Sequence, residues 1–241
     1  MAGRVVILPL LSKAETRRHA NTVLALRRYW IARPRAPSHF HSLGVNAYMD
    51  LAGGAAGRSR YASRVQSSND CLRAHFAPLL EAVSAAIAEH MGEPTTLHHP
   101  FALPGMHIWE GRAIPRARGA SLHFDLQHQL LKWPPELKPE RSATLSFTVA
   151  LRLPADGGSL WTWDYSYADY RAARRSGRPH RLRDVAAATP TEHVYELGSL
   201  VLHSGHVLHQ IAPVARRHPG DVRITLQGHG IRAGGAWLLY W

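Results

Sequence analysis

The sequence predicts an α+β protein in which a mainly helical N-terminal part, residues 1–100, precedes a β-rich part, residues 101–241. Two observations support this division. Apolar residues recur at helical spacing in the first hundred residues, whereas short apolar or alternating runs separated by Gly and Pro dominate the rest. The chain of 241 residues is long enough for one large domain, and no linker is evident. We therefore expect a single domain, 1–241, whose β-rich part is a sandwich, jelly roll or barrel.

Two helices are expected in the N-terminal part. The first covers residues 12–33, because Ser12 followed by Glu15 is a capping-box signature and Pro34 would end the helix. The second covers residues 69–91, where apolar residues recur at helical spacing before a Gly and a Pro. The glycine-rich segment that lies between the two helices is expected to be irregular.

Short strands are expected after residue 100, each bounded by turn-forming residues. A polar stretch, residues 165–184, interrupts them; it is expected to hold a short helix capped by Ser166 and ended at Gly177, and it could form a lid. The other interpretation of this stretch is a solvated helix with charged residues facing water. The expected strands are residues 105–109, 121–127, 143–153, 159–163, 199–203, 207–214 and 223–231.

Composition limits the location and partners of the protein. The single cysteine, Cys71, excludes an internal disulfide. The apolar run at residues 5–11 is too short for a membrane span and is not followed by a small-residue cleavage site, so we expect a cytoplasmic protein without a membrane partner. The formal charge of +12 is compatible with nucleic acid, an acidic protein partner or an anionic small molecule, although the 29 Lys and Arg residues are spread along the chain.

The alternating segment at residues 121–127, SLHFDLQ, carries candidate metal ligands. In a strand His123 and Asp125 project from the same face. Iron(II) oxygenases hold their metal with two histidines and one carboxylate, so a second histidine is expected on a later strand. The later segment GSLVLHSGHVLHQIAPV offers three candidates, of which the third is best placed: His203, His206 and His209.

A candidate anion-binding residue lies further along the chain. After the turn RRHPGD, the strand-like run RITLQG places Arg223, Thr225 and Gln227 on one face. A guanidinium at this position could bind a dicarboxylate through two parallel charge-assisted hydrogen bonds, and Thr225 could add a hydroxyl donor. An exposed arginine in a basic protein is the alternative interpretation.

These pieces together resemble the iron(II)- and 2-oxoglutarate-dependent dioxygenases, most closely the prolyl-hydroxylase-like branch, over residues 101–231. The motifs HFD, ATLSFTVALRLPADGGSLWTW, GSLVLHSGHVLHQIAPV and VRITL occur in the family's order. The resemblance implies a double-stranded β-helix, a cupin-like relative of the jelly roll, with the N-terminal helices packed against it. It further implies Fe(II), 2-oxoglutarate and O2 as cofactor and cosubstrates. The residues implied are His123, Asp125 and His209 as iron ligands, and Arg223 with Thr225 as the anchor of 2-oxoglutarate.

The sequence departs from the family pattern in two places. Arg223 lies 14 residues beyond His209, further than is usual for the branch, so Arg216 or Arg217 could take its place; we prefer Arg223 because the HPGD turn accounts for the extra residues. His107 and Trp109 occupy the strand in which the branch often has a tyrosine that contacts the cosubstrate. His107 and Trp109, together with Trp163, are the candidate substrate contacts.

The resemblance implies an oxidation of a small molecule such as an amino acid or a natural-product intermediate. Related halogenases have a small residue at the position of Asp125, so this carboxylate favours hydroxylation, desaturation or cyclisation. Two alternatives remain open from the sequence. One is a nucleic-acid dealkylase or protein hydroxylase of the same superfamily, suggested by the basic charge. The other is a non-catalytic metal- or sugar-binding jelly roll.

Overall fold

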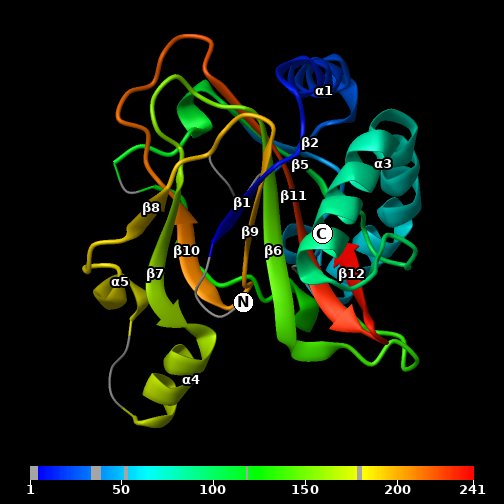
Figure 1. Ribbon diagram of the computed structural model, residues 1–241, viewed down its shortest axis with the longest axis vertical. Coiled ribbons are helices and arrows are strands. Elements are labelled where there is room, and N and C mark those ends of the chain that lie inside the picture. Colours follow the sequence, from blue (N-terminus) through cyan, green and yellow to red (C-terminus); the bar gives the residue numbers. More distant parts are fainter. Residues whose placement is uncertain (1–4, 34–38, 52–53, 118, 178–180) are drawn as a thin grey trace.

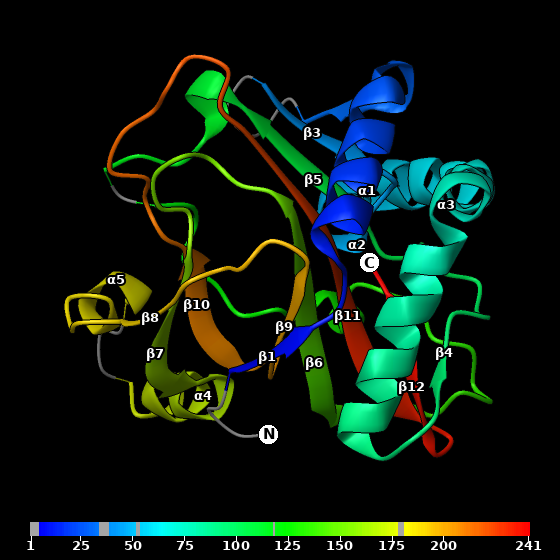
Figure 2. The same cartoon turned by 45° about the horizontal axis from the view of Figure 1, so that its top comes forward.

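The computed structural model describes residues 5–33, 39–51, 54–117, 119–177 and 181–241. In this part of the chain, two sheets with mostly antiparallel strands face each other, and helices cover the outer face of the larger sheet (Figures 1 and 2). The larger sheet contains β1 (Val6–Pro9), β2 (Ile31–Ala32), β3 (Phe40–Leu43), β4 (Thr95–Thr96), β5 (Gly105–Glu110), β6 (Glu140–Arg152), β9 (Ser199–His203), β11 (Val222–Ala233) and β12 (Ala236–Tyr240). The smaller sheet contains β7 (Leu160–Ser166), β8 (Thr191–His193) and β10 (Val207–Ile211).

The strand order supports a jelly-roll-like core. The larger sheet has the order β1-β9-β6-β11-β5-β3-β2, with β12 beside the second half of β11 and β4 parallel to β12. The smaller sheet has the order β10-β7-β8. Strands β5, β6, β7, β9, β10 and β11 fall where the sequence predicted strands, whereas β8 and β12 were not predicted.

The N-terminal part contributes more to the sheet than the sequence predicted. β1 pairs with β9, and β3 pairs with β5, so chain segments far apart in sequence lie side by side. The segment expected to be irregular contains β3 and the short helix α2 (Ala47–Asp50). Both elements were missed because a four-residue strand acquires its stability from distant partners rather than from its own pattern.

The first helix is shorter than predicted. α1 (Lys13–Ala25) begins with the expected capping box: the Glu15 amide donates to Ser12 Oγ at 3.2 Å, and the Ser12 amide donates to the Glu15 carboxylate at 2.9 Å. It ends eight residues before the predicted end at residue 33, because a 3-10 turn follows and β2 then pairs with β3. Pro34, the predicted stop, lies outside the described residues.

The second helix is longer than predicted. α3 (Gly54–Met91) begins fifteen residues earlier than expected, and its buried stripe packs with α1 against the larger sheet. The buried side chain of Asn69 links α3 to the segment before β5. Its Nδ2 donates to the Phe101 carbonyl at 3.0 Å, and its Oδ1 accepts from the Leu103 backbone amide at 2.9 Å. Among the described helices, α3 has the length and composition of a membrane span, but its apolar residues form part of the protein core.

The central strands of the larger sheet have two chemically different faces. On β6, Leu145 and Val149 pack against the helices, whereas Ser146 and Thr148 project to the opposite side. The same alternation along β11 places Ile224 and Leu226 in the core and Arg223, Thr225, Gln227 and His229 on the polar side. This polar face lies opposite the smaller sheet, and the candidate site forms between them.

The polar stretch before β8 is helical, as predicted. α4 (Tyr167–Arg175) has Ser166 as its N-cap, with a capping box completed by Asp169, and Gly177 follows it with a φ of +72°. A second short helix, α5 (Leu182–Val185), leads into β8. Both helices lie at the outer edge of the smaller sheet (Figure 1).

Candidate metal centre

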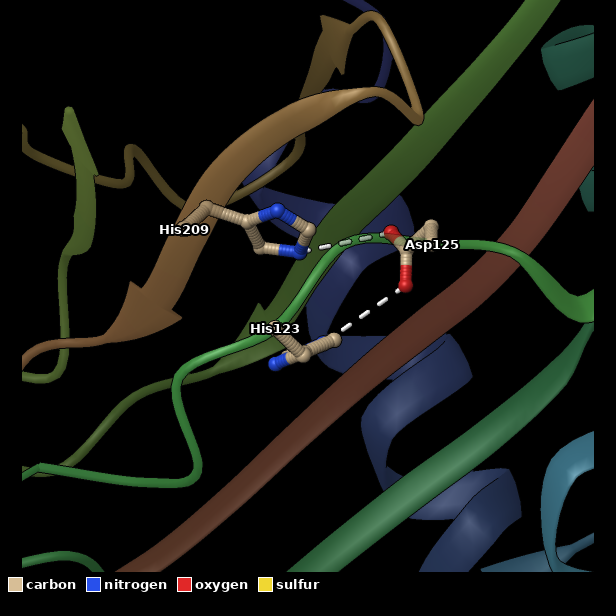
Figure 3. Close-up of side chains that lie close together, drawn as sticks. All are labelled: His123, Asp125 and His209. Atoms are coloured by element: carbon tan, nitrogen blue, oxygen red, sulfur yellow. Dashed lines mark ion pairs between the residues drawn. The ribbon is translucent and has the colours of Figure 1, made fainter. Parts of the chain in front are cut away.

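Three side chains converge between the two sheets: His123, Asp125 and His209 (Figure 3). His209 lies on β10, and the other two lie on the segment before β6. His209 Nε2 is 3.3 Å from one Asp125 carboxylate oxygen, and His123 Nε2 is 3.5 Å from the other. One candidate ligand atom from each residue lies within 4.8 Å of those of the other two. Two imidazole nitrogens and one carboxylate that leave other positions open are the donor set of non-haem iron(II) oxygenases.

Backbone carbonyl groups orient both imidazoles. The His123 Nδ1 atom lies 2.8 Å from the Ser121 carbonyl, and His209 Nδ1 lies 2.8 Å from the Val207 carbonyl. A carbonyl only accepts a hydrogen bond, so in the neutral ring the proton is on Nδ1 and the Nε2 lone pair faces the centre. This is the arrangement by which proteins prepare histidine for a metal.

Main-chain pairing holds the two histidines together. The His123 amide donates to the His209 carbonyl at 3.0 Å, and the His209 amide donates to the His123 carbonyl at 3.1 Å. The Asp125 amide donates to the Gly205 carbonyl at 2.8 Å. The prediction of a strand over residues 121–127 is wrong, because this segment forms only an isolated antiparallel bridge between His123 and His209. That bridge is sufficient to direct His123 and Asp125 to the same side.

The electrostatics of the cluster favour an ionised carboxylate. Burial alone would raise the pKa of Asp125, but the charges of His209 and His229 and the hydrogen bond from His209 hold that pKa well below its usual value. Burial opposes a charge on His209 as well, yet Asp125 raises the pKa of His209, so the charged ring, whose Nε2 faces Asp125 at 3.3 Å, would lose that proton when a metal binds. Gln127 Nε2 donates to the Asp125 carboxylate at 3.0 Å and fixes its rotation.

Two further buried histidines surround the three candidate ligands. The His203 ring lies 4.5 Å from the His209 ring, and burial lowers the pKa of His203 to about 3, so it is neutral. His229 Nδ1 lies 3.9 Å from an Asp125 oxygen and 3.2 Å from Ser146 Oγ. His229 was not predicted from the sequence, although it extends the face of β11 that carries Arg223. His206, the third histidine of the predicted segment, lies outside the cluster, with its ring 5.7 Å from that of Tyr167.

Arg223 is buried without a carboxylate partner among the described residues. It is 0% exposed, and its Nη1 donates to Thr225 Oγ1 at 3.2 Å, while Nε and Nη2 have no hydrogen-bond partner. Its guanidinium carbon lies 5.3 Å from the centroid of the Tyr195 ring. Burial lowers the pKa of the guanidinium, and a hydrogen bond with the Tyr195 side chain opposes that shift. Buried donors without partners cost free energy, so this group fits an anionic ligand that would accept from both.

The two alternative arginines are placed differently. Arg217 donates from Nε and Nη2 to the Ile114 carbonyl at 2.8 and 2.6 Å, so these donors already have an acceptor. Arg216 is exposed. Neither arginine therefore has the buried, unpartnered donors of Arg223.

A cavity of about 840 Å³ opens beside the three candidate ligands. His107 and Trp109, two residues apart on β5, both line it, and their role as substrate contacts stays a prediction. Trp163 does not lie among the lining residues; its indole Nε1 donates to the Ala188 carbonyl at 2.9 Å on the outer side of the smaller sheet. A cavity of this size accommodates a small organic molecule.

The sequence analysis missed one element of the cavity, helix α2. Its Tyr48 lines the cavity, with the hydroxyl 3.2 Å from His107 Nε2. A buried ion pair holds α2 in place, with Arg33 Nη1 2.8 Å from the Asp50 carboxylate. No local pattern in the glycine-rich segment around Tyr48 signals this placement.

The comparisons with known proteins support the fold. No protein-family model and no curated protein matches the sequence. Among solved structures, an N-substituted L-amino acid dioxygenase from Burkholderia ambifaria AMMD in complex with alpha-KG is similar, with a TM-score of 0.59, 14% identity, and coverage of 98% of this chain and 86% of that one. A second structure of the same dioxygenase gives a TM-score of 0.60 at 13% identity, with the same coverage. AviO1 from Streptomyces viridochromogenes Tue57 gives 0.50 at 14% identity, covering 96% of this chain and 90% of that one. The chain thus has the fold of an iron- and 2-oxoglutarate-dependent dioxygenase, which confirms the resemblance at the level of the fold.

Proposed function

We propose that the protein is an Fe(II)- and 2-oxoglutarate-dependent dioxygenase that oxidises a small molecule. One observation carries the proposal: Arg223, with two donors that lack a partner, projects from the same face of β11 as His229, whose Nδ1 lies 3.9 Å from Asp125 in the candidate metal cluster. A metal site alone would fit many jelly rolls. A metal site combined with a buried, unpartnered arginine fits an enzyme that also binds an acidic cosubstrate.

The residues present fit iron. His123 and His209 offer Nε2 lone pairs fixed by backbone carbonyls, and Asp125 offers an ionised carboxylate. These three residues would hold the metal and leave its other positions open. Iron(II) with 2-oxoglutarate and O2 supplies the oxidation, in which the cosubstrate is decarboxylated to succinate and one oxygen atom is available for a C–H bond of the substrate.

The chain would also hold 2-oxoglutarate. Arg223 would bind its distal carboxylate through the two donors that lack a partner, and Thr225 orients the guanidinium from its third nitrogen. Both residues are 0% exposed, so the charge pair would form away from water, where charge-assisted hydrogen bonds are strong.

The remaining assignments follow from the same proposal. The two sheets correspond to a double-stranded β-helix with helices α1 and α3 on its outer face. The carboxylate of Asp125 favours hydroxylation, desaturation or cyclisation. A cavity of about 840 Å³ between the sheets suits a small molecule such as an amino acid or a natural-product intermediate, and the similar dioxygenase from Burkholderia ambifaria acts on N-substituted L-amino acids.

The test is a combined metal and product measurement. Metal-free protein is loaded with iron(II) and 2-oxoglutarate without oxygen, mixed with a panel of candidate substrates, and exposed to oxygen. We expect stoichiometric iron binding, release of succinate, and a product heavier by one oxygen atom or lighter by two hydrogens. Asp125→Ala should lose both iron and succinate release. Protein that binds iron but releases no succinate with or without substrate would favour a non-catalytic metal-binding jelly roll.

A further inference from the structure

Among the described residues, three arginines line the cavity: Arg112, Arg116 and Arg217. Arg112 and Arg116 are exposed and Arg217 is half-buried. Of the described residues that line the cavity, only Asp125 carries a carboxylate, and it is one of the three candidate iron ligands. We call the three arginines the arginine rim.

The acidic residues near these loops have other partners. Glu110 pairs with Arg27, 2.7 Å away, and Asp156 lies 2.9 Å from His218. No carboxylate in the described part of the chain forms an ion pair with Arg112, Arg116 or Arg217. The positive charge of the rim is therefore available to a ligand.

The rim is held by pairing between two loops, one after β5 and one between β10 and β11 (Figures 1 and 2). The Val214 amide donates to the Pro115 carbonyl at 2.9 Å, and Arg116 forms a parallel bridge with Val214. Arg217 reaches across to the Ile114 carbonyl with two hydrogen bonds. Beneath the loops, Ile114 and Val214 pack with Trp109 in a small buried cluster. The arginines are thus mounted on a packed support, which reduces the entropy lost when a ligand binds.

An apolar wall continues from this cluster into the cavity. The Trp109 ring stacks on Phe40 with a centroid distance of 4.0 Å, and Met49 and Ile211 pack beside them. All four of these side chains line the cavity. A ligand that binds here would place an apolar body against the wall and a charged group at the rim.

We propose that the substrate is a small organic anion whose carboxylate or phosphate group binds the arginine rim, with an apolar body along Trp109 that directs the reacting carbon toward the metal centre. This inference rests on the proposed function and names its substrate class. The rim is distinct from Arg223, which is fully buried, is not among the residues that line the cavity, and is assigned to 2-oxoglutarate. Nucleic acid fits less well, because a polynucleotide needs a long basic surface and the rim has three arginines at the mouth of a cavity.

The test compares matched ligands on the iron- and 2-oxoglutarate-loaded protein without oxygen. The probes are hydrophobic carboxylic acids, their primary amides and the corresponding phosphate monoesters, and the readout is affinity by calorimetry, followed by succinate release on adding oxygen. We expect one anionic series, carboxylate or phosphate, to bind about tenfold more tightly than the amides. Arg116→Gln and Arg217→Gln should each remove most of this preference while affinity for the amides stays constant, and Arg116→Lys should keep part of it.

The control is Arg64→Gln, which removes the same charge from an exposed position on α3 outside the cavity. It should leave the preference unchanged. Three results would overturn the inference: equal affinity for acids, esters and amides, no binding of any anion, or equal losses in the Arg64 and Arg116 variants. If the protein still binds iron and 2-oxoglutarate, the proposed function is not affected by these results. Absence of stoichiometric iron would refute the proposed function instead. Steeply salt-dependent binding of a single-stranded oligonucleotide, lost in Arg116→Gln, would assign the rim to a polynucleotide and also overturn the inference.

Discussion

Replacing Arg223 should separate cosubstrate binding from metal binding. Arg223 is 0% exposed and uses one nitrogen on Thr225, which leaves Nε and Nη2 for a ligand. Removing one partner of a buried charge pair costs about 2–5 kcal/mol. We therefore expect Arg223→Met to raise the dissociation constant of 2-oxoglutarate by about 30-fold to about 5,000-fold. Iron affinity should stay nearly constant, because Arg223 is not a ligand.

The same substitution gives an opposite effect on the protein without cosubstrate. In that state the guanidinium is a buried charge without a carboxylate partner in the described chain, and replacing such a group by an apolar side chain of similar length is neutral or stabilising. We expect Arg223→Met to keep or raise the midpoint of thermal unfolding. A purely structural role for Arg223 would instead lower it.

The assay is an anaerobic titration of iron-loaded protein with 2-oxoglutarate, followed by succinate release at several cosubstrate concentrations. Arg223→Lys should recover only part of the affinity, since lysine keeps the charge but loses the planar pair of donors. Arg216→Gln and Arg217→Gln serve as controls and should leave 2-oxoglutarate affinity unchanged. Unchanged affinity in Arg223→Met, with a large loss in either control, would move the anchor to the loop and refute the reasoning.

Three further predictions test the metal centre and its surroundings. Asp125→Ala should weaken iron binding by at least about 10-fold and abolish succinate release while the far-ultraviolet circular dichroism spectrum is retained, because it removes one of three protein donors but no core packing. His206→Ala should retain iron and activity, since His206 lies outside the cluster; an essential His206 together with a dispensable His209 would show that the ligand position on β10 is wrongly assigned. His128 is 1% exposed, its Nδ1 has no hydrogen-bond partner, and burial lowers its pKa from 6.5 to about 4. The unfolded chain then binds a proton on His128 more readily than the folded one. The contribution of neutral His128 to the free energy of unfolding is therefore complete above about pH 6.5 and decreases as the pH falls toward 4, by roughly 2 kcal/mol between pH 7.5 and 5. Urea unfolding of metal-free wild type and His128→Phe at both pH values measures this difference, and identical pH dependence in the two proteins would contradict it.

The sequence predicted the parts of the fold that depend on local alternation. The period of two in β6 and β11 predicted strands, and on β11 it placed Arg223 and Thr225 on one face. The spacing of His123 and Asp125 predicted neighbouring side chains, and they are neighbours, although the segment is held by a single bridge rather than a strand. A bridge of one residue pair leaves no longer pattern to recognise.

Elements that depend on long-range pairing could not be predicted. β1 and β3 are four residues long and pair with strands more than sixty residues away in sequence. Tyr48 reaches the cavity because α2 is held by the ion pair between Arg33 and Asp50, which joins residues 17 positions apart. Trp163 was a candidate substrate contact as an aromatic residue on a predicted strand, but it does not line the cavity and its indole donates to the Ala188 carbonyl.

The main-chain pairing of His123 with His209 has a consequence for metal selection. Reciprocal backbone hydrogen bonds fix these two ligands relative to each other without a contribution from the metal. A rigid set of two nitrogens and one oxygen does not change its geometry to favour one divalent ion over another. Copper, nickel and zinc bind sites of this type more tightly than iron(II) does. The identity of the bound ion would then follow from supply during synthesis and purification. Protein isolated on a nickel column should be treated with a chelator and reloaded with iron(II) without oxygen before its activity is assessed.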